Sequence, residues 1–115
     1  MNTEQMMTCI RECLECMKKC NRCYDACLQE EEVNPITACI RLTRDCADVC
    51  VLAAQFMTRN SEHMKEACVL CADICTRCAE ECRNHAYGHC QGCAAACEAC
   101  AKKCRAMAAA QTKWC

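Results

Sequence analysis

The chain is poor in the residues that usually build a hydrophobic core and in those that interrupt helices. Leu, Ile, Val and Phe together make up 14 of the 115 residues, and there are only 2 Gly and 1 Pro. So few large apolar side chains usually indicate disorder when net charge is high, but here the net charge is only −1. The scarcity of helix breakers therefore favours a folded, mainly helical protein.

Strong charge and long apolar runs are missing as well, which argues against two classes of partner. A chain with a pI near 6.3 has no basic field for nucleic acid and no basic amphipathic face for a membrane. No stretch of about 18 apolar residues occurs, and no basic region followed by an apolar run stands at the start. We therefore expect a cytoplasmic protein that binds neither nucleic acid nor membrane.

Cysteine and alanine are abundant instead, with 20 Cys and 18 Ala. Alanine is the best helix former and buried cysteine behaves as a small hydrophobe, so together they can supply the missing core. The length suits a single domain over 1–115, with its core at about 4–110 and a tail at 111–115 that carries Cys115 outside the core. Because disulfides are rare in the cytosol, so many cysteines indicate metal or redox chemistry.

The cysteines recur in steps of four and three, which place them on one face of an α-helix at the spacing of a bundle seam. Four segments with short connections carry this pattern, so neighbouring helices should be antiparallel. The predicted fold is all-α, an up-down-up-down four-helix bundle with a Cys-lined core. The segments are 4 to about 32, about 35 to 59, 62 to about 86, and about 89 to 110. The stripe cysteines are Cys9, Cys13, Cys16, Cys20, Cys23, Cys27, Cys39, Cys46, Cys50, Cys68, Cys71, Cys75, Cys78, Cys82, Cys90, Cys93, Cys97, Cys100 and Cys104.

Two polar residues predict where helices begin. Asn34 stands before Pro35, a residue that suits a first helical turn, and is expected to be the N-cap of the second helix. Ser61 is expected to cap the third helix, because its hydroxyl can accept a hydrogen bond from an unpaired amide.

The stripe cysteines could be plain core thiols, disulfides or metal ligands. A disulfide needs Cβ atoms about 3.5–4.5 Å apart, whereas helical neighbours three or four residues apart lie about 5–6 Å apart. Two metal–thiolate bonds of about 2.3 Å fit that spacing better. Cu(I) that displaces one thiol proton leaves the core neutral, whereas Zn²⁺ with four thiolates leaves a doubly negative site. The pattern therefore favours many Cu(I) ions.

The alternating helix direction gathers different soft ligands at the two ends of the bundle. Thioether and imidazole both suit copper. Methionine at a bundle end is explained equally well as packing, and histidine near a helix end as a cap, so both interpretations stay open. At one end lie Met6, Met57, Met64 and Met107, and at the other lie His85 and His89.

The pattern H-x3-H-C-x2-C-x3-C-x2-C-x3-C, from His85 through Cys104, together with the other stripes, resembles the bacterial copper storage proteins, in particular their cytosolic branch. The resemblance covers roughly residues 6–107. It implies a homotetramer of four-helix bundles that bind many Cu(I) ions, mostly through pairs of the stripe thiolates. It leaves open which end admits copper, since a methionine-rich end resembles the copper entrance of exported relatives and histidine near the mouth suits cytosolic ones.

The leading hypothesis is a non-enzymatic store for Cu(I) in copper homeostasis, with copper donor or acceptor proteins as possible partners. One alternative is an iron–sulfur, ferredoxin-like electron carrier, although the cysteines lie on helices rather than in the loop typical of such clusters. Another is a scavenger of zinc or oxidants. No residue stands out as a catalytic nucleophile among so many equivalent thiols.

Overall fold

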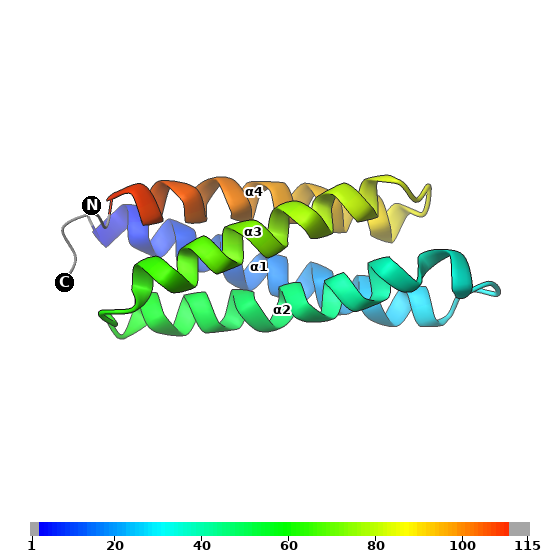
Figure 1. Ribbon diagram of the computed structural model, residues 1–115, viewed down its shortest axis with the longest axis horizontal. Coiled ribbons are helices and arrows are strands. Elements are labelled where there is room, and N and C mark those ends of the chain that lie inside the picture. The colour runs from blue at the N-terminus through cyan, green and yellow to red at the C-terminus, as the bar shows by residue number, and fades with distance from the viewer. Residues whose placement is uncertain (1–2, 111–115) are drawn as a thin grey trace.

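The computed structural model describes residues 3–110 and contains no strand in that range (Figure 1). The predicted all-α four-helix bundle is confirmed. The predicted tail 111–115, with Cys115, lies outside the described residues. The elements are α1 (Thr3–Leu28), the 3₁₀ turn η1 (Asn34–Ile36), α2 (Thr37–Thr58), α3 (Met64–Arg83) and α4 (Gly88–Ala110).

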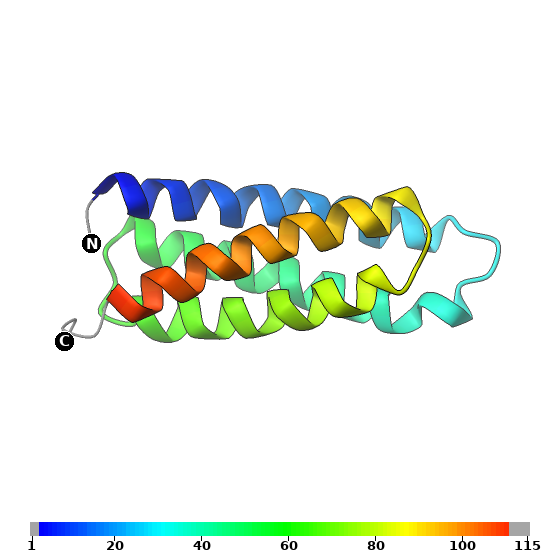
Figure 2. The same cartoon turned by 90° about the horizontal axis from the view of Figure 1, so that it is seen from above.

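The helices run alternately up and down along one axis and form a rod of 48 × 19 × 18 Å (Figures 1 and 2). Each helix packs against its neighbours in sequence, and α1 also packs against α4, which closes the ring. Both ends of the described chain lie at the same end of the rod as the α2–α3 connection. The α1–α2 and α3–α4 connections lie at the opposite end.

Small side chains allow the helices to approach closely. Buried alanines recur seven residues apart beside the cysteine stripes of α2, α3 and α4, as expected for residues that flank a bundle seam. Interhelical distance depends on the side chains at the contact, so alanine brings the helix axes together and the thiols within reach of one another. These alanines are Ala47 and Ala54 in α2, Ala72 and Ala79 in α3, and Ala94, Ala101 and Ala108 in α4.

The first connection differs from the prediction. The first helix ends at Leu28 rather than near residue 32. The prediction that Asn34 is an N-cap is wrong, because Val33 and Ile36 flank η1 and α2 and neither helix start has a side-chain cap. Pro35 lies inside η1, so the chain turns once in 3₁₀ geometry before α2 begins.

The second connection is shorter, and in it Asn60 adopts a left-handed backbone with φ of 56°, a conformation that asparagine tolerates better than most residues. The hydroxyl of Ser61 accepts a hydrogen bond from the amide of His63 at 3.0 Å. The prediction that Ser61 caps the third helix is nevertheless wrong, because His63 is the N-cap of α3, without a side-chain cap hydrogen bond, and α3 starts at Met64, two residues later than expected.

Candidate metal-binding core

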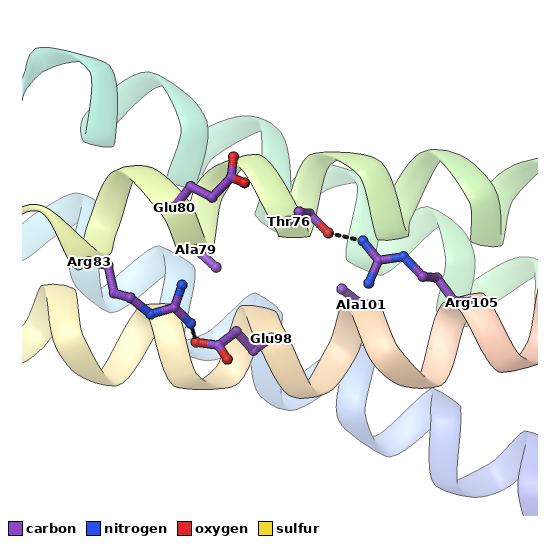
Figure 3. Close-up of a pocket in the computed structure, with 7 residues that line it drawn as sticks. All are labelled: Thr76, Ala79, Glu80, Arg83, Glu98, Ala101 and Arg105. Carbon is purple, nitrogen blue, oxygen red and sulfur yellow. Dashed lines mark hydrogen bonds and ion pairs between the residues drawn. The ribbon is translucent and has the colours of Figure 1, made fainter.

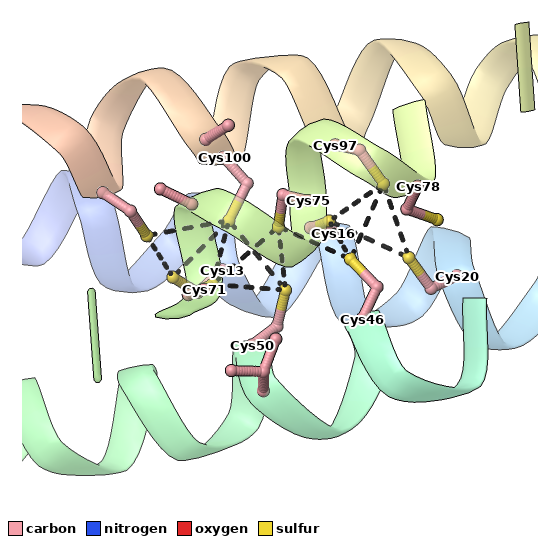
Figure 4. Close-up of a cluster of buried hydrophobic side chains, with 14 of the residues drawn as sticks. Cys13, Cys16, Cys20, Cys46, Cys50, Cys71, Cys75, Cys78, Cys97 and Cys100 are labelled. Atoms are coloured by element: carbon pink, nitrogen blue, oxygen red, sulfur yellow. Dashed lines mark hydrogen bonds between the residues drawn. The ribbon is translucent and has the colours of Figure 1, made fainter. Parts of the chain in front are cut away.

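Nineteen of the 20 cysteines lie in the described part of the chain, and all of them are buried free thiols. None is more than 1% exposed. They line the axis of the bundle on all four helices, so every stripe cysteine predicted from the sequence faces inward (Figure 4). The second helix contributes only three, since Thr43 and Ala53 occupy inner positions of its stripe.

The thiols form a continuous network from one end of the rod to the other. Contacts between helices are the shortest: Sγ of Cys39 lies 3.3 Å from Sγ of Cys82, and Sγ of Cys46 lies 3.4 Å from Sγ of Cys75. Four-step neighbours within a helix lie slightly farther apart, as in Cys16–Cys20 at 3.9 Å. These distances are shorter than the roughly 4.6 Å spanned by two collinear metal–thiolate bonds of the length found for zinc. Small side-chain rotations would therefore admit an ion between any such pair.

Several sets of four thiols lie close enough to surround one ion, with all four sulfurs within 4.8 Å of one another. Three of these sets are linked by shared members, Cys16 and Cys46 in one case and Cys20 and Cys97 in the other, so each of these sulfurs borders two sites. Among these sets are Cys23, Cys27, Cys39 and Cys90; Cys20, Cys78, Cys93 and Cys97; Cys16, Cys20, Cys46 and Cys97; Cys16, Cys46, Cys50 and Cys75; and Cys13, Cys71, Cys100 and Cys104.

Burial keeps the outermost thiols of this network protonated. At Cys27 desolvation is the largest cause and raises the pKa to about 11, and desolvation likewise raises the pKa of Cys90. Deeper in the core, hydrogen bonding with neighbouring thiols is the largest cause and acts in both directions: it raises the pKa of Cys50 and Cys97 and lowers the pKa of Cys78. A proton must therefore leave when a metal ion binds to the thiols whose pKa is raised.

The methionines form a closed end. Met57, Met64 and Met107 are at most 1% exposed, and Met6 is half-buried. Met6 and Met107 lie near the outer ends of α1 and α4, and Met57 and Met64 lie beside the α2–α3 connection. All four therefore share the end of the rod that holds both ends of the described chain (Figure 1), as the alternating helix direction predicted. Three fully buried thioether side chains therefore belong to the same buried core as the cysteines at that end.

The histidines lie at the opposite end but in different surroundings. Nδ1 of His89 lies 3.4 Å from Sγ of Cys23, 3.6 Å from Sγ of Cys90 and 3.9 Å from Sγ of Cys27. Nε2 of His85 instead lies 2.7 Å from a carboxylate oxygen of Glu81. Of the two predicted histidines, the structure thus brings His89 into the sulfur network, while His85 is paired with a carboxylate beside it.

Sequence reasoning missed three residues around these histidines. Nε2 of His89 lies 3.0 Å from a carboxylate oxygen of Glu30, and the ring of Tyr87 stacks on the His89 ring with centroids 5.3 Å apart. Glu81 lies four residues before His85, a helical spacing that could have revealed the pair. Glu30 is 59 residues from His89 in sequence, so no local signal pointed to it.

A shallow surface pocket between α3 and α4 has no comparable set of ligands (Figure 3). Arg83 forms an ion pair with Glu98 across it, and Arg105 donates a hydrogen bond to Thr76. These polar groups connect the two helices, which indicates a structural role. None of the described helices is long and apolar enough to cross a membrane.

Comparison with known proteins gives consistent results. A sequence model described as copper storage protein matches residues 2–109. A cysteine-rich protein of Bacillus subtilis (strain 168), YhjQ, is 52% identical over 101 residues, which span 88% of this chain and 94% of that protein.

Solved structures are similar over nearly the whole chain. The Cu(I)-bound copper storage protein BsCsp3 has 50% identity and a TM-score of 0.87, covering 90% of this chain and 98% of its own. A cytosolic copper storage protein from Streptomyces lividans, solved with five coppers, has 39% identity and a TM-score of 0.89, covering 92% of this chain and 93% of its own.

Proposed function

The chain belongs to the copper storage protein family, and we propose that it stores many Cu(I) ions on the thiolates that line its bundle. The observation that carries this proposal is the continuous row of nineteen buried thiols along the bundle axis. The resemblance inferred from the cysteine stripes indicates copper as the bound ion, and so do the copper-bound relatives.

Charge neutrality explains why a buried sulfur core suits a monovalent ion. Uncompensated charge is very unfavourable inside a protein. Each Cu(I) that replaces one thiol proton leaves the core neutral, so ions can accumulate until their number approaches that of the thiols. Divalent ions held by four thiolates would instead build up negative charge along the axis. The iron–sulfur and zinc alternatives gain no support, since the cysteines lie on packed helices and the copper-bound relatives share the fold.

We place the copper entrance at the histidine end of the rod. At that end the side chain of His89 is 21% exposed while its Nδ1 faces three buried thiols, so it connects solvent with the sulfur network. At the other end, Met57, Met64 and Met107 are buried. In this proposal the nineteen stripe cysteines are storage ligands, His89 receives incoming ions, and the four methionines close the store. His85, paired with Glu81, is an additional ligand at the mouth only after that pair opens.

Further parts of the proposal concern the protein as a whole. It performs no catalysis, since no thiol differs from its neighbours in the way a nucleophile requires. It acts in the cytoplasm, as does the S. lividans relative described as cytosolic. Assembly as a homotetramer is expected from the family resemblance, and exposed Leu14, Leu28, Val69 and Leu70 provide apolar surface for it. Light scattering of the purified protein tests the oligomeric state.

Anaerobic titration tests the storage function. Reduced protein is mixed with increasing Cu(I) in the presence of a chromogenic Cu(I) chelator, and copper and protein are then counted after gel filtration. We expect the protein to withhold copper from the chelator until many ions are bound per chain. Saturation at one or two ions would contradict the proposal.

A further inference from the structure

We propose that Glu30 is a positioning residue that holds the His89 imidazole so that its Nδ1 atom faces the thiols at the mouth of the bundle. The proposal rests on the proposed function insofar as His89 receives copper. Its principal test, however, concerns the protein without copper.

The contact between Glu30 and His89 determines which nitrogen of the His89 ring carries the hydrogen. Nε2 of His89 lies 3.0 Å from a carboxylate oxygen of Glu30. An ionised carboxylate only accepts hydrogen bonds, so Nε2 must carry the hydrogen. In the neutral ring the lone pair then belongs to Nδ1. Glu30 thus selects the tautomer in which the nitrogen on the thiol side is the one able to bind a metal ion.

The other ring nitrogen of His89, Nδ1, faces possible metal ligands. Nδ1 lies within 3.9 Å of the sulfurs of Cys23, Cys27 and Cys90, which are all fully buried. In the metal-free protein this nitrogen can accept a hydrogen bond from one of these thiols. Histidine ligands in proteins commonly donate their second N–H to a carboxylate, which sets ring orientation and basicity. Glu30 is the carboxylate that accepts the second N–H of His89 in this way.

The position of Glu30 in the fold supports a specific role. Glu30 follows α1 in the connection to α2, whereas His89 lies in the first turn of α4, so their bond joins the α1–α2 connection to the start of α4 at the mouth. Tyr87 stacks on the same ring at an interplanar angle of 7°. The ring is therefore held at its edge by Glu30 and on its face by Tyr87.

The pair formed by His85 and Glu81 provides an internal comparison. Its bond of 2.7 Å joins residues of sequence separation four at the end of α3. It joins Nε2 of His85 to a carboxylate, and within residues 3–110 His85 has no thiol contact of the kind that His89 makes. A carboxylate beside a histidine at this end is therefore not sufficient to mark a metal ligand. The pair of Glu30 and His89 differs because Nδ1 of His89 faces the thiols.

The experiment compares the wild type with Glu30→Ala, Glu30→Gln and the control Glu31→Ala, which removes an exposed carboxylate from the same connection. Long-range ¹H–¹⁵N spectra of the metal-free, reduced protein at a pH of about 8.5, where free histidine is neutral, report the tautomer of His89. We expect the Nε2–H tautomer in the wild type, in Glu30→Gln, whose amide oxygen still accepts the bond, and in Glu31→Ala. Glu30→Ala should show a mixture of tautomers. The wild-type tautomer in Glu30→Ala, with an unchanged circular dichroism spectrum, would overturn the proposal.

A second measurement follows transfer of the first Cu(I) equivalents from a chelator. We expect Glu30→Ala to weaken this first binding about 10- to 100-fold, the usual effect of removing the partner of a ligand histidine. Glu31→Ala should leave it unchanged, and the final copper capacity should be equal in all variants. First binding as tight in Glu30→Ala as in the wild type would refute the positioning role while leaving storage intact. A capacity of one or two ions in the wild type would refute storage while leaving the tautomer result valid.

Discussion

The substitution Cys97→Ala tests whether the thiols act as one connected store. Sγ of Cys97 lies 3.7 Å from the sulfurs of Cys16, Cys20 and Cys46 and 3.9 Å from that of Cys93. It belongs to two of the four-thiol sets, so its removal weakens two neighbouring sites at once. Charge neutrality requires about one thiolate per Cu(I), and the loss of this sulfur should therefore lower the copper capacity by one or two ions.

The same substitution should destabilise the metal-free protein only moderately. If the sulfur counts as one methylene, losing its burial costs about 0.8 kcal/mol. A void no larger than about 30 Å³, the volume of one water, adds about 0.7 kcal/mol at ~24 cal/mol per Å³. The total of about 1.5 kcal/mol should lower the urea midpoint by about 0.5–1.5 M, given the usual slopes for small proteins.

The matched control is Thr43→Ala, at another fully buried position of the inner stripes. Its hydroxyl donates to the carbonyl of Ile40 at 3.0 Å, so its removal should cost about 1 kcal/mol without removing a thiolate. Both variants are unfolded in urea without copper under reducing conditions and then titrated with Cu(I). The reasoning fails if Cys97→Ala keeps the full copper capacity, or if Thr43→Ala loses as much capacity as Cys97→Ala.

Three more outcomes follow from the same core. Thr43→Cys continues the sulfur stripe of α2 at a fully buried position and should raise the copper capacity by about one ion, which elemental analysis after anaerobic loading measures; an unchanged capacity would contradict it. The metal-free protein should lose stability in urea as pH rises from 9 toward 11. The folded state raises the pKa of Cys27 from 9.0 to about 11, so its thiol favours folding most strongly below pH 9. A rise in the free energy of unfolding over that pH range would contradict this prediction. Copper loading should raise the unfolding free energy by about 4 kcal/mol per site when free Cu(I) exceeds its Kd about 1,000-fold, and thermal unfolding at equal midpoints with and without copper would contradict this.

The fold was predictable because the cysteine stripes carry two kinds of information at once. Their alternating steps identify the helices and also the inner face of each helix. The direction of each helix then followed from the short connections, and with it the separation of Met57 and Met64 from His85 and His89. Local spacing and tertiary arrangement agree in this protein, and every described stripe cysteine is buried.

The parts that could not be predicted depend on contacts between distant residues. The first helix ends at Leu28, four residues earlier than its pattern suggested, and Glu30 in the following turn bonds to His89. The sequence could place His85 and His89 near the same end, but it could not distinguish them. Only the packing of α4 against α1 brings the ring of His89 to Cys23 and leaves His85 with Glu81.

The arrangement of the thiols also bears on the proposal that copper enters at the His89 end. From His89, sulfur contacts of at most 4.0 Å lead through Cys23 and Cys39 to Cys82 and Cys78. From there the sets linked by Cys20 and Cys97, and then by Cys16 and Cys46, lead to Cys50, whose sulfur lies 3.8 Å from that of Cys71 in the set with Cys13, Cys100 and Cys104. An ion held by two sulfurs can therefore bind a third before it leaves the first, so it never crosses a region without a ligand. If copper enters beside His89 as proposed, it should leave by the same route, because the methionines at the far end are buried, and it should be released in the reverse order of its loading.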